Sequence, residues 1–166
     1  MGRKTLFVDI NRCTGCDLCA LTCSFVKEKT YSYGKSRMWV VKDESRALGI
    51  PVVCEQCEDA PCVAACPTKA LIKEIETGIV KLNGDRCIGC KECMWICPFG
   101  AILIDPKKGV AIKCDLCDGD PACVKVCYPR ALQYLRLDRP SELMKRQKLV
   151  EKRLRALASV ALGGVV

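Results

Sequence analysis

The sequence predicts an α+β fold in which short strands and loops surround four metal clusters and a single helix ends the chain. Three observations lead to this prediction. Sixteen cysteines stand in 166 residues, and they fall into four runs of four. Short apolar segments bounded by turn residues follow the second and third runs, as is typical of hairpins. Residues 138–166 contain no cysteine and repeat apolar side chains with the period of a helix.

The third run carries the most specific motif. It reads C-x2-C-x2-C-x3-C-P, with Cys87, Cys90, Cys93 and Cys97 followed by Pro98. This is the spacing with which bacterial ferredoxins hold iron–sulfur clusters. Three cysteines at steps of three let one short loop reach three iron corners of a cube. The fourth cysteine points away from that loop and, in two-cluster ferredoxins, binds the neighbouring cluster.

Three further runs share this pattern with small departures. Ser24 follows the first run where a proline is usual, Pro67 follows the second, and Pro129 comes one position late after the fourth. The first and third runs are tight, whereas the second and fourth are widened in the middle, so the chain contains an internal repeat. The other candidate ligands are Cys13, Cys16, Cys19 and Cys23, then Cys54, Cys57, Cys62 and Cys66, and finally Cys114, Cys117, Cys123 and Cys127.

The segments between the runs predict the remaining elements. Residues 4–11 are expected to form a strand, residues 20–29 a short helix and residues 37–42 another strand. Two hairpins are expected, one over residues 70–82 and one over residues 101–113. These hairpins match the strands of a ferredoxin. Residues 1–137 are therefore predicted to form two ferredoxin-like units, one nested inside the other in sequence.

Residues 138–166 are predicted to form a C-terminal amphipathic helix for docking or assembly. Ser141 is its expected N-cap and Gly163-Gly164 its expected end. Its apolar final segment is about 11 residues long, which is too short for a transmembrane segment of ~20 residues. The helix is expected to pack on its own domain, on another subunit or second copy, or on a membrane surface. The expected apolar stripe is Leu143, Val150, Leu154, Leu157 and Ala161, with Lys145, Arg146, Lys148, Lys152, Arg153 and Arg155 on the other side.

Disulfides and zinc are the alternative uses of so many cysteines. Disulfides need an oxidising compartment, and the N-terminal stretch does not read as a signal peptide because Asp9 interrupts its apolar residues, so a cytoplasmic location is expected. Zinc sites usually pair one C-x2-C with a distant second pair, so runs at steps of three suit a cube better. The sequence contains no histidine, which excludes Rieske and histidine-ligated haem centres.

The formal net charge of +8 counts every cysteine as neutral. Thiolates on all sixteen, together with four oxidised clusters of charge 2+, would bring this charge to zero. The basic excess is therefore no argument for nucleic-acid binding, and few aromatic residues are available to stack on bases. A zinc-binding nucleic-acid module remains the alternative of another class.

The four runs, with the segments Cys54–Cys62 and Cys66–Leu71, resemble the four-cluster ferredoxin-type electron-transfer subunits of molybdenum and tungsten oxidoreductases. Hydrogenase, formate dehydrogenase and carbon monoxide dehydrogenase systems are the alternative settings. The resemblance covers about residues 4–137, and the short chain is most similar to the small subunit of tungsten-containing aldehyde oxidoreductases. It implies crossed ligation, in which each run lends its last cysteine to another run. The implied sets are Cys13, Cys16, Cys19 and Cys127; Cys114, Cys117, Cys123 and Cys23; Cys87, Cys90, Cys93 and Cys66; and Cys54, Cys57, Cys62 and Cys97.

The resemblance also implies a function. Single electrons would pass through four 4Fe-4S clusters between a partner's metal–pterin site and a flavin subunit, a ferredoxin or another copy of the chain. Nothing in the sequence resembles a catalytic base, a nucleotide loop or a pterin site, so no catalytic site of its own is expected. Trp95 and Phe99 are expected to shield the third-run cluster from water. The basic residues beside ligands, mostly expected to be solvated, are Arg12, Arg86, Lys91 and Lys113.

Overall fold

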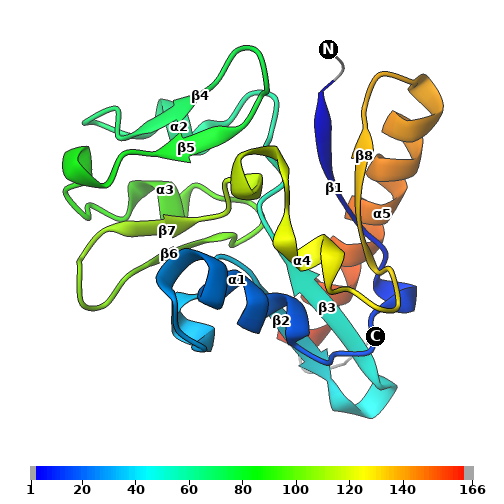
Figure 1. Cartoon of the computed structure of the whole chain (residues 1–166). Helices are drawn as coiled ribbons and strands as arrows, with labels where there is room; N and C mark the ends of the chain where they lie inside the picture. The colour runs from blue at the N-terminus through cyan, green and yellow to red at the C-terminus, as the bar shows by residue number, and fades with distance from the viewer. Residues whose placement is uncertain (1–2, 163–166) are drawn as a thin grey trace.

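Strand pairing within residues 3–162, the part of the chain that the structure describes, is limited to four two-stranded antiparallel sheets. In this computed structural model the sheets, five α-helices and short 3-10 turns surround the loops that carry the cysteines (Figure 1). The predicted α+β class is thereby confirmed. None of the helices in the described region has both the length and the apolarity needed to cross a membrane.

The inner unit, residues 54–113, contains two hairpins, each preceded by a short helix. It forms the green lobe on the left of Figure 1. Both predicted hairpins are confirmed, with strands shorter than expected. The elements are α2 (Pro61–Ala64), β4 (Leu71–Lys73), β5 (Val80–Leu82), α3 (Glu92–Trp95), β6 (Ile102–Ile104) and β7 (Ala111–Lys113). The side chains of Leu71, Val80 and Ile102 are buried together between these elements.

Turn residues specify where these short strands end. Gly78 and Gly109 have positive φ angles of 69° and 68°, a conformation that glycine adopts without steric cost. In the second hairpin the Asp105 carboxylate accepts hydrogen bonds from the backbone N–H groups of Lys107 and Lys108, at 2.8 and 3.0 Å. Such side-chain bonds favour a turn over further strand.

The outer unit is assembled from the two ends of the cysteine-bearing region. Strand β1 (Lys4–Val8) pairs antiparallel with β8 (Leu132–Arg136), so the inner unit is inserted between the two halves of the outer one. This is the nesting that the sequence predicts. Helix α1 (Leu18–Glu28) packs against α4 (Ala122–Lys125). The first strand is shorter than expected because a 3-10 turn at Ile10–Arg12 leads into the first run.

A hairpin before the second run packs against this outer unit. Strand β2 (Trp39–Asp43) pairs with β3 (Leu48–Val52), which contacts the turn at Ile10–Arg12. The side chains of Ile50 and Val52 are buried in the larger core. The sequence predicts β2 but not its pairing with β3.

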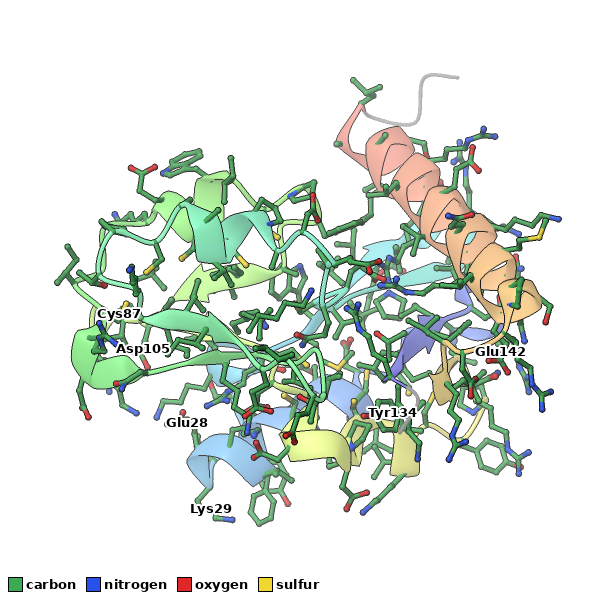
Figure 2. All side chains as sticks on the ribbon, turned by 90° about the horizontal axis from the view of Figure 1, so that it is seen from above. Glu28, Lys29, Cys87, Asp105, Tyr134 and Glu142 are labelled. Carbon is green, nitrogen blue, oxygen red and sulfur yellow. The ribbon has the colours of Figure 1, made fainter. Side chains whose placement is uncertain are left out.

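Helix α5 (Pro140–Ala161) confirms the predicted C-terminal helix and packs on its own chain, against β1 and β3. Figure 2 shows Glu142 of α5 and Cys87 of the inner unit at opposite sides of the molecule. The predicted N-cap is wrong, since Arg139 takes that position with Pro140 directly after it and no side-chain hydrogen bond. The expected end at Gly163-Gly164 lies outside the described residues.

The predicted apolar stripe of α5 is also wrong in part. Leu143 and Leu154 are exposed, whereas Arg153, expected on the polar side, is buried. The guanidinium of Arg153 pairs with the buried carboxylate of Glu55, and Arg146 approaches the same carboxylate at 3.0 Å. An ion pair therefore occupies the middle of the face that a hydrophobic pattern assigns to solvent.

Candidate iron–sulfur sites

The structure gathers the sixteen cysteines around four cavities. Each cavity is lined by the first three cysteines of one run and the last cysteine of another. With the open solvent at their mouths included, three cavities have a volume of about 330 Å³ and the fourth about 320 Å³, so all four suit the same kind of guest. They are the Cys13 cavity (Cys13, Cys16, Cys19, Cys127), the Cys114 cavity (Cys23, Cys114, Cys117, Cys123), the Cys54 cavity (Cys54, Cys57, Cys62, Cys97) and the Cys87 cavity (Cys66, Cys87, Cys90, Cys93).

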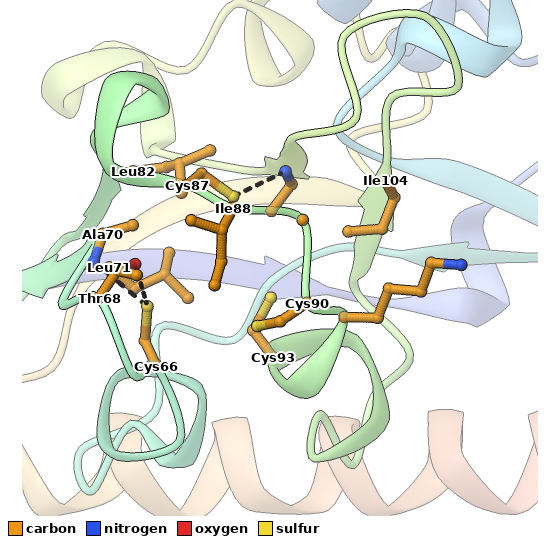
Figure 3. Close-up of a pocket in the computed structure, with 13 residues that line it drawn as sticks. Cys66, Thr68, Ala70, Leu71, Leu82, Cys87, Ile88, Cys90, Cys93 and Ile104 are labelled. Atoms are coloured by element: carbon orange, nitrogen blue, oxygen red, sulfur yellow. Dashed lines mark hydrogen bonds between the residues drawn. The ribbon is translucent and has the colours of Figure 1, made fainter.

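The Cys87 cavity shows how the chain builds such a site (Figure 3). Cys87 and Cys90 belong to the loop before α3, Cys93 lies in α3, and Cys66 follows α2. The four thiols face the same space, and apolar side chains such as Leu71 complete the wall. Two separate segments of the chain therefore supply the donors of one site.

The last cysteine of every run accepts a backbone hydrogen bond on its sulfur. The donors for Cys66 and Cys97 are Ala70 and Ala101, four residues later, at 3.2 and 3.3 Å. In both cases a proline follows the cysteine and turns the chain back. The donor for Cys127 is Leu132, five residues later, in keeping with the later position of Pro129. No proline follows Cys23, so α1 continues and the donor is the backbone N–H of Arg37. Hydrogen bonds to sulfur tune the potential of a cluster.

A residue with positive φ precedes the second cysteine of every run. It is Gly15 or Gly89 in the tight runs, and Gln56 or Leu116, with φ of 50° and 55°, in the wide runs. Glycine has no steric cost there, whereas glutamine and leucine are strained. Such strain persists where the surroundings hold the residue in place, commonly at functional sites. Gln56 is held by side-chain hydrogen bonds to Cys114 and Val80.

Burial controls the protonation of the thiols. It raises the pKa of Cys19 and Cys114 to about 12, and that of Cys57 and Cys62 to about 11. At Cys66 burial also acts to raise the pKa, but hydrogen bonds from the backbone N–H of Leu71 and neighbouring donors outweigh it and lower the value. The metal-free sites thus hold mostly neutral thiols, which must lose protons to become ligands.

Comparison with known proteins identifies the chain's family. A family model described as a 4Fe-4S dicluster domain matches residues 46–136. The chain belongs to this family. The polyferredoxin-like subunit of an aliphatic sulfonate oxidoreductase from Pyrococcus furiosus is 39% identical, over 76% of this chain and 72% of that one. The thiosulfate reductase electron transfer subunit PhsB of Salmonella typhi is 38% identical, over 78% of this chain and 74% of that one.

Among solved structures, a chain of the active site complex BamBC of benzoyl coenzyme A reductase with benzoyl-CoA is similar to this dicluster protein. The match has a TM-score of 0.50 and 26% identity, and it covers 95% of this chain and 96% of that one. Since the likeness extends over nearly the whole length, it includes the outer unit and the helix after it as well as the matched family domain.

The donor set of this 4Fe-4S dicluster protein fits cubic clusters. All sixteen cysteines are free thiols, so disulfides do not account for them. Among residues 3–162, no three His, Cys, Asp or Glu side chains come close enough together to hold a single metal ion. The four thiols of each cavity surround a space rather than meet at a point, which suits a guest larger than one zinc ion.

The exposure of the cysteines distinguishes outer from inner cavities. Of the sixteen, only Cys16 and Cys90 are exposed, and they line the Cys13 and Cys87 cavities. In the dicluster protein the other two cavities are more enclosed. The Cys114 and Cys54 cavities adjoin, because Gln56 donates hydrogen bonds both to the sulfur of Cys54 and to the carbonyl of Cys114.

Three side chains near the sites lie elsewhere than the sequence predicts. Trp95 is 77% exposed and is not among the residues that line the Cys87 cavity, and Phe99 lines the Cys54 cavity instead of that one. Lys113, one of the basic residues expected to be solvated, is buried. The strand pattern of β7 could have revealed it, because residues two apart share a face and Ala111 is buried as well.

Proposed function

We propose that this protein is an iron–sulfur electron-transfer subunit that holds four 4Fe-4S clusters, one in each cavity. The observation that carries the proposal is the set of four cavities of nearly equal volume, each lined by four cysteines. Each bound cluster would accept and release one electron. The ligands would be the four cysteines of its cavity, with the last cysteine of each run crossing to the neighbouring site.

The chain's own residues prepare these sites for electron transfer. Short helices and loops hold the thiols around each cavity, and backbone N–H groups favour their thiolate form. Apolar side chains, among them Phe99 and Met38, form part of the lining of the Cys54 and Cys114 cavities. Electrons would pass through clusters in the Cys13, Cys114, Cys54 and Cys87 cavities in that order. Crossing cysteines join the Cys13 cavity to the Cys114 cavity, and the Cys54 cavity to the Cys87 cavity. Cys16 and Cys90, the exposed cysteines, would then mark the two ends of the path.

We also propose that the substrate is bound by a partner subunit and that this chain has no catalytic site of its own. The names of the relatives, subunits of sulfonate oxidoreductase and thiosulfate reductase, support a place in an oxidoreductase complex. A tungsten aldehyde oxidoreductase with a metal–pterin site is the proposed partner, and a hydrogenase, formate dehydrogenase or carbon monoxide dehydrogenase is the alternative. Ile88 and Trp95, both exposed near Cys90, would contact that partner. A flavin subunit or a ferredoxin would take up the electrons.

A cytoplasmic location and self-assembly complete the proposal. A reducing compartment keeps sixteen cysteines free for cluster assembly. Copies would join through the outer face of α5, where Leu143 and Met144 are exposed. Since the inner face of α5 is packed on the domain, substitution of both residues by glutamine tests assembly better than removal of the helix. An unchanged mass by light scattering would exclude this contact.

Metal and sulfide analysis tests the central proposal. Protein produced anaerobically with cluster-assembly machinery should be brown and contain about sixteen iron and sixteen labile sulfide per chain. Colourless protein that contains zinc would instead support the nucleic-acid module. Identification of proteins that co-purify from native cells would then name the partner. Purification of the chain with no oxidoreductase subunit would contradict its place in a complex.

A further inference from the structure

Lys113 is a buried cation without a carboxylate partner in the described region. It is the last residue of β7, and its side chain forms part of the wall of the Cys54 cavity. The ammonium donates hydrogen bonds to the carbonyl oxygens of Cys114 and Val80, at 2.7 and 2.9 Å, and to the side-chain oxygen of Gln56, at 3.4 Å. Within residues 3–162 no Asp or Glu lies within ion-pair distance of it. Burial of an unpaired charge costs free energy, so we expect another source of negative charge near Lys113 to offset this cost.

Gln56 completes a polar bridge between the two inner cavities. Its side-chain amide donates to the Cys114 carbonyl at 2.9 Å, and its side-chain oxygen accepts the backbone N–H of Val80 at 2.9 Å. Its own N–H donates to the sulfur of Cys54 at 3.4 Å. The strained backbone of Gln56 thereby connects one cysteine of the Cys54 cavity with one of the Cys114 cavity, and Lys113 lies at the centre of this bridge.

We propose that the buried positive charge of Lys113 raises the reduction potentials of the clusters in the Cys54 and Cys114 cavities. This rests on the proposed function, because both cavities must hold clusters. Transfer between the two clusters would move one electron from one to the other, with no bond made or broken, and Lys113 would contribute only its charge. Each electron adds one negative charge, which a buried cation stabilises strongly where the dielectric constant is low.

Lys113 lies beside cysteines of both inner cavities. Its side chain lines the Cys54 cavity together with Cys62, and its ammonium donates to the carbonyl of Cys114, which lines the other cavity. These two cysteines belong to different cavities, one in the inner unit and one in the outer. The same cation therefore favours negative charge on both sides of the boundary between the units, where an electron has to cross.

Anaerobic redox titration followed by EPR tests the proposal, with Lys113→Met as the variant and Lys91→Met as the matched control. Both lysines adjoin a ligand in sequence, but Lys91 is exposed and screened by water. For Lys113→Met, two of the four reduction equilibria should shift at least tenfold toward the oxidised form, about 59 mV for a one-electron couple. Lys91→Met should change none of them by that amount, and Lys113→Arg should restore the wild-type values.

The iron content of each protein distinguishes failure of the Lys113 proposal from failure of the proposed function. Lys113→Met protein with full iron and unchanged potentials would overturn the proposal. If the methionine variant does not retain iron, the titration uses Lys113→Gln, which keeps a hydrogen-bond donor for the Cys114 carbonyl. Loss of iron from both neutral variants would show that Lys113 only holds the fold together, which also overturns the proposal. Wild-type protein without iron would instead refute the proposed function itself.

Discussion

At the scale of single residues, proline after the last cysteine of a run decides where the sulfur finds its hydrogen bond. Pro67 and Pro98 turn the chain so that an alanine N–H reaches the sulfur four residues later. Ser24 permits α1 to continue to Glu28, and the donor for Cys23 comes from Arg37. The sequence shows that the proline is missing, but it cannot show which distant residue replaces the lost donor, because that depends on how residues 30–53 fold back.

Replacement of a crossing cysteine should affect the cavity of the other run. In Cys66→Ser the Cys87 cavity loses one of its four thiols, whereas the Cys54 cavity keeps all of its own. About a quarter of the iron should be lost or become labile, and one EPR signal should change. Cys97→Ser is the matched control and should affect the Cys54 cavity and a different signal. The same signal changing in both variants would contradict the crossed assignment.

Charged side chains were the least predictable residues. Lys113 and Arg153 are both buried, although charged side chains at the end of a strand and on the polar side of a helix are usually expected in water. Their burial depends on acceptors from distant parts of the chain, such as Glu55 for Arg153 and Val80 for Lys113. A count of apolar residues along one helix or strand contains no information about these partners.

At the scale of elements, α5 is held by an ion pair as well as by apolar packing. In Arg153→Ala the buried Glu55 carboxylate keeps only Arg146, so the free energy of unfolding should fall by about 3 kcal/mol. Arg155→Ala is the control, because the Arg155 side chain is 79% exposed and pairs with Glu151 on the surface. The measurement is the midpoint of anaerobic urea unfolding. Equal midpoints for the two variants would show that the buried pair adds no stability.

The hairpin of β2 and β3 depends on one close approach to the first run. A Cβ atom at Gly49 would lie 2.7 Å from the backbone nitrogen of Gly15 and 2.9 Å from the sulfur of Cys13. Gly49→Ala should therefore displace the first-run loop and release the iron of the Cys13 cavity first. At Gly84 a Cβ would meet no atom within 4 Å, so Gly84→Ala should keep its full iron content. Iron analysis with EPR compares the two, and full iron in Gly49→Ala would contradict the expected clash.

Local elements were predictable because their signals are local. Turn residues specify the inner hairpins, and the helical period specifies α5. The pairings of β1 with β8 and of β2 with β3 were not predicted, since β-pairing across distant segments depends on the tertiary fold. The division of the chain after residue 137 remains a prediction, although α5 is packed tightly on the domain before it.

At the scale of the whole molecule, the four cavities dominate the interior. Cysteines occupy both hydrophobic cores, and much of the burial that holds the units together surrounds the cavities. The grouping of the cysteines could be expected from spacing and resemblance. The enclosure of the middle cavities and the exposure of Cys16 and Cys90 at the outer ones required the structure.

Iron release should accelerate as the pH falls. Burial raises the pKa of Cys19 and Cys114 to about 12, so metal-free sites bind protons at any lower pH, and protons compete with iron for the sulfur. Because bound clusters need thiolates, their stability decreases with decreasing pH. Transfer of iron to a saturating chelator should be severalfold faster near pH 6 than near pH 8, at constant ionic strength. A rate independent of pH would mean that proton uptake does not accompany cluster loss.

Pairing of the first strand with the last one of the cysteine-bearing region sets an order on biosynthesis. During translation, Cys13, Cys16 and Cys19 are made early, but the fourth cysteine of their cavity, Cys127, is made much later. All eight cysteines of the inner unit's cavities have been translated by Cys97, while β8 is still unmade. A nascent chain can therefore receive cofactors in its centre before its own two ends have met.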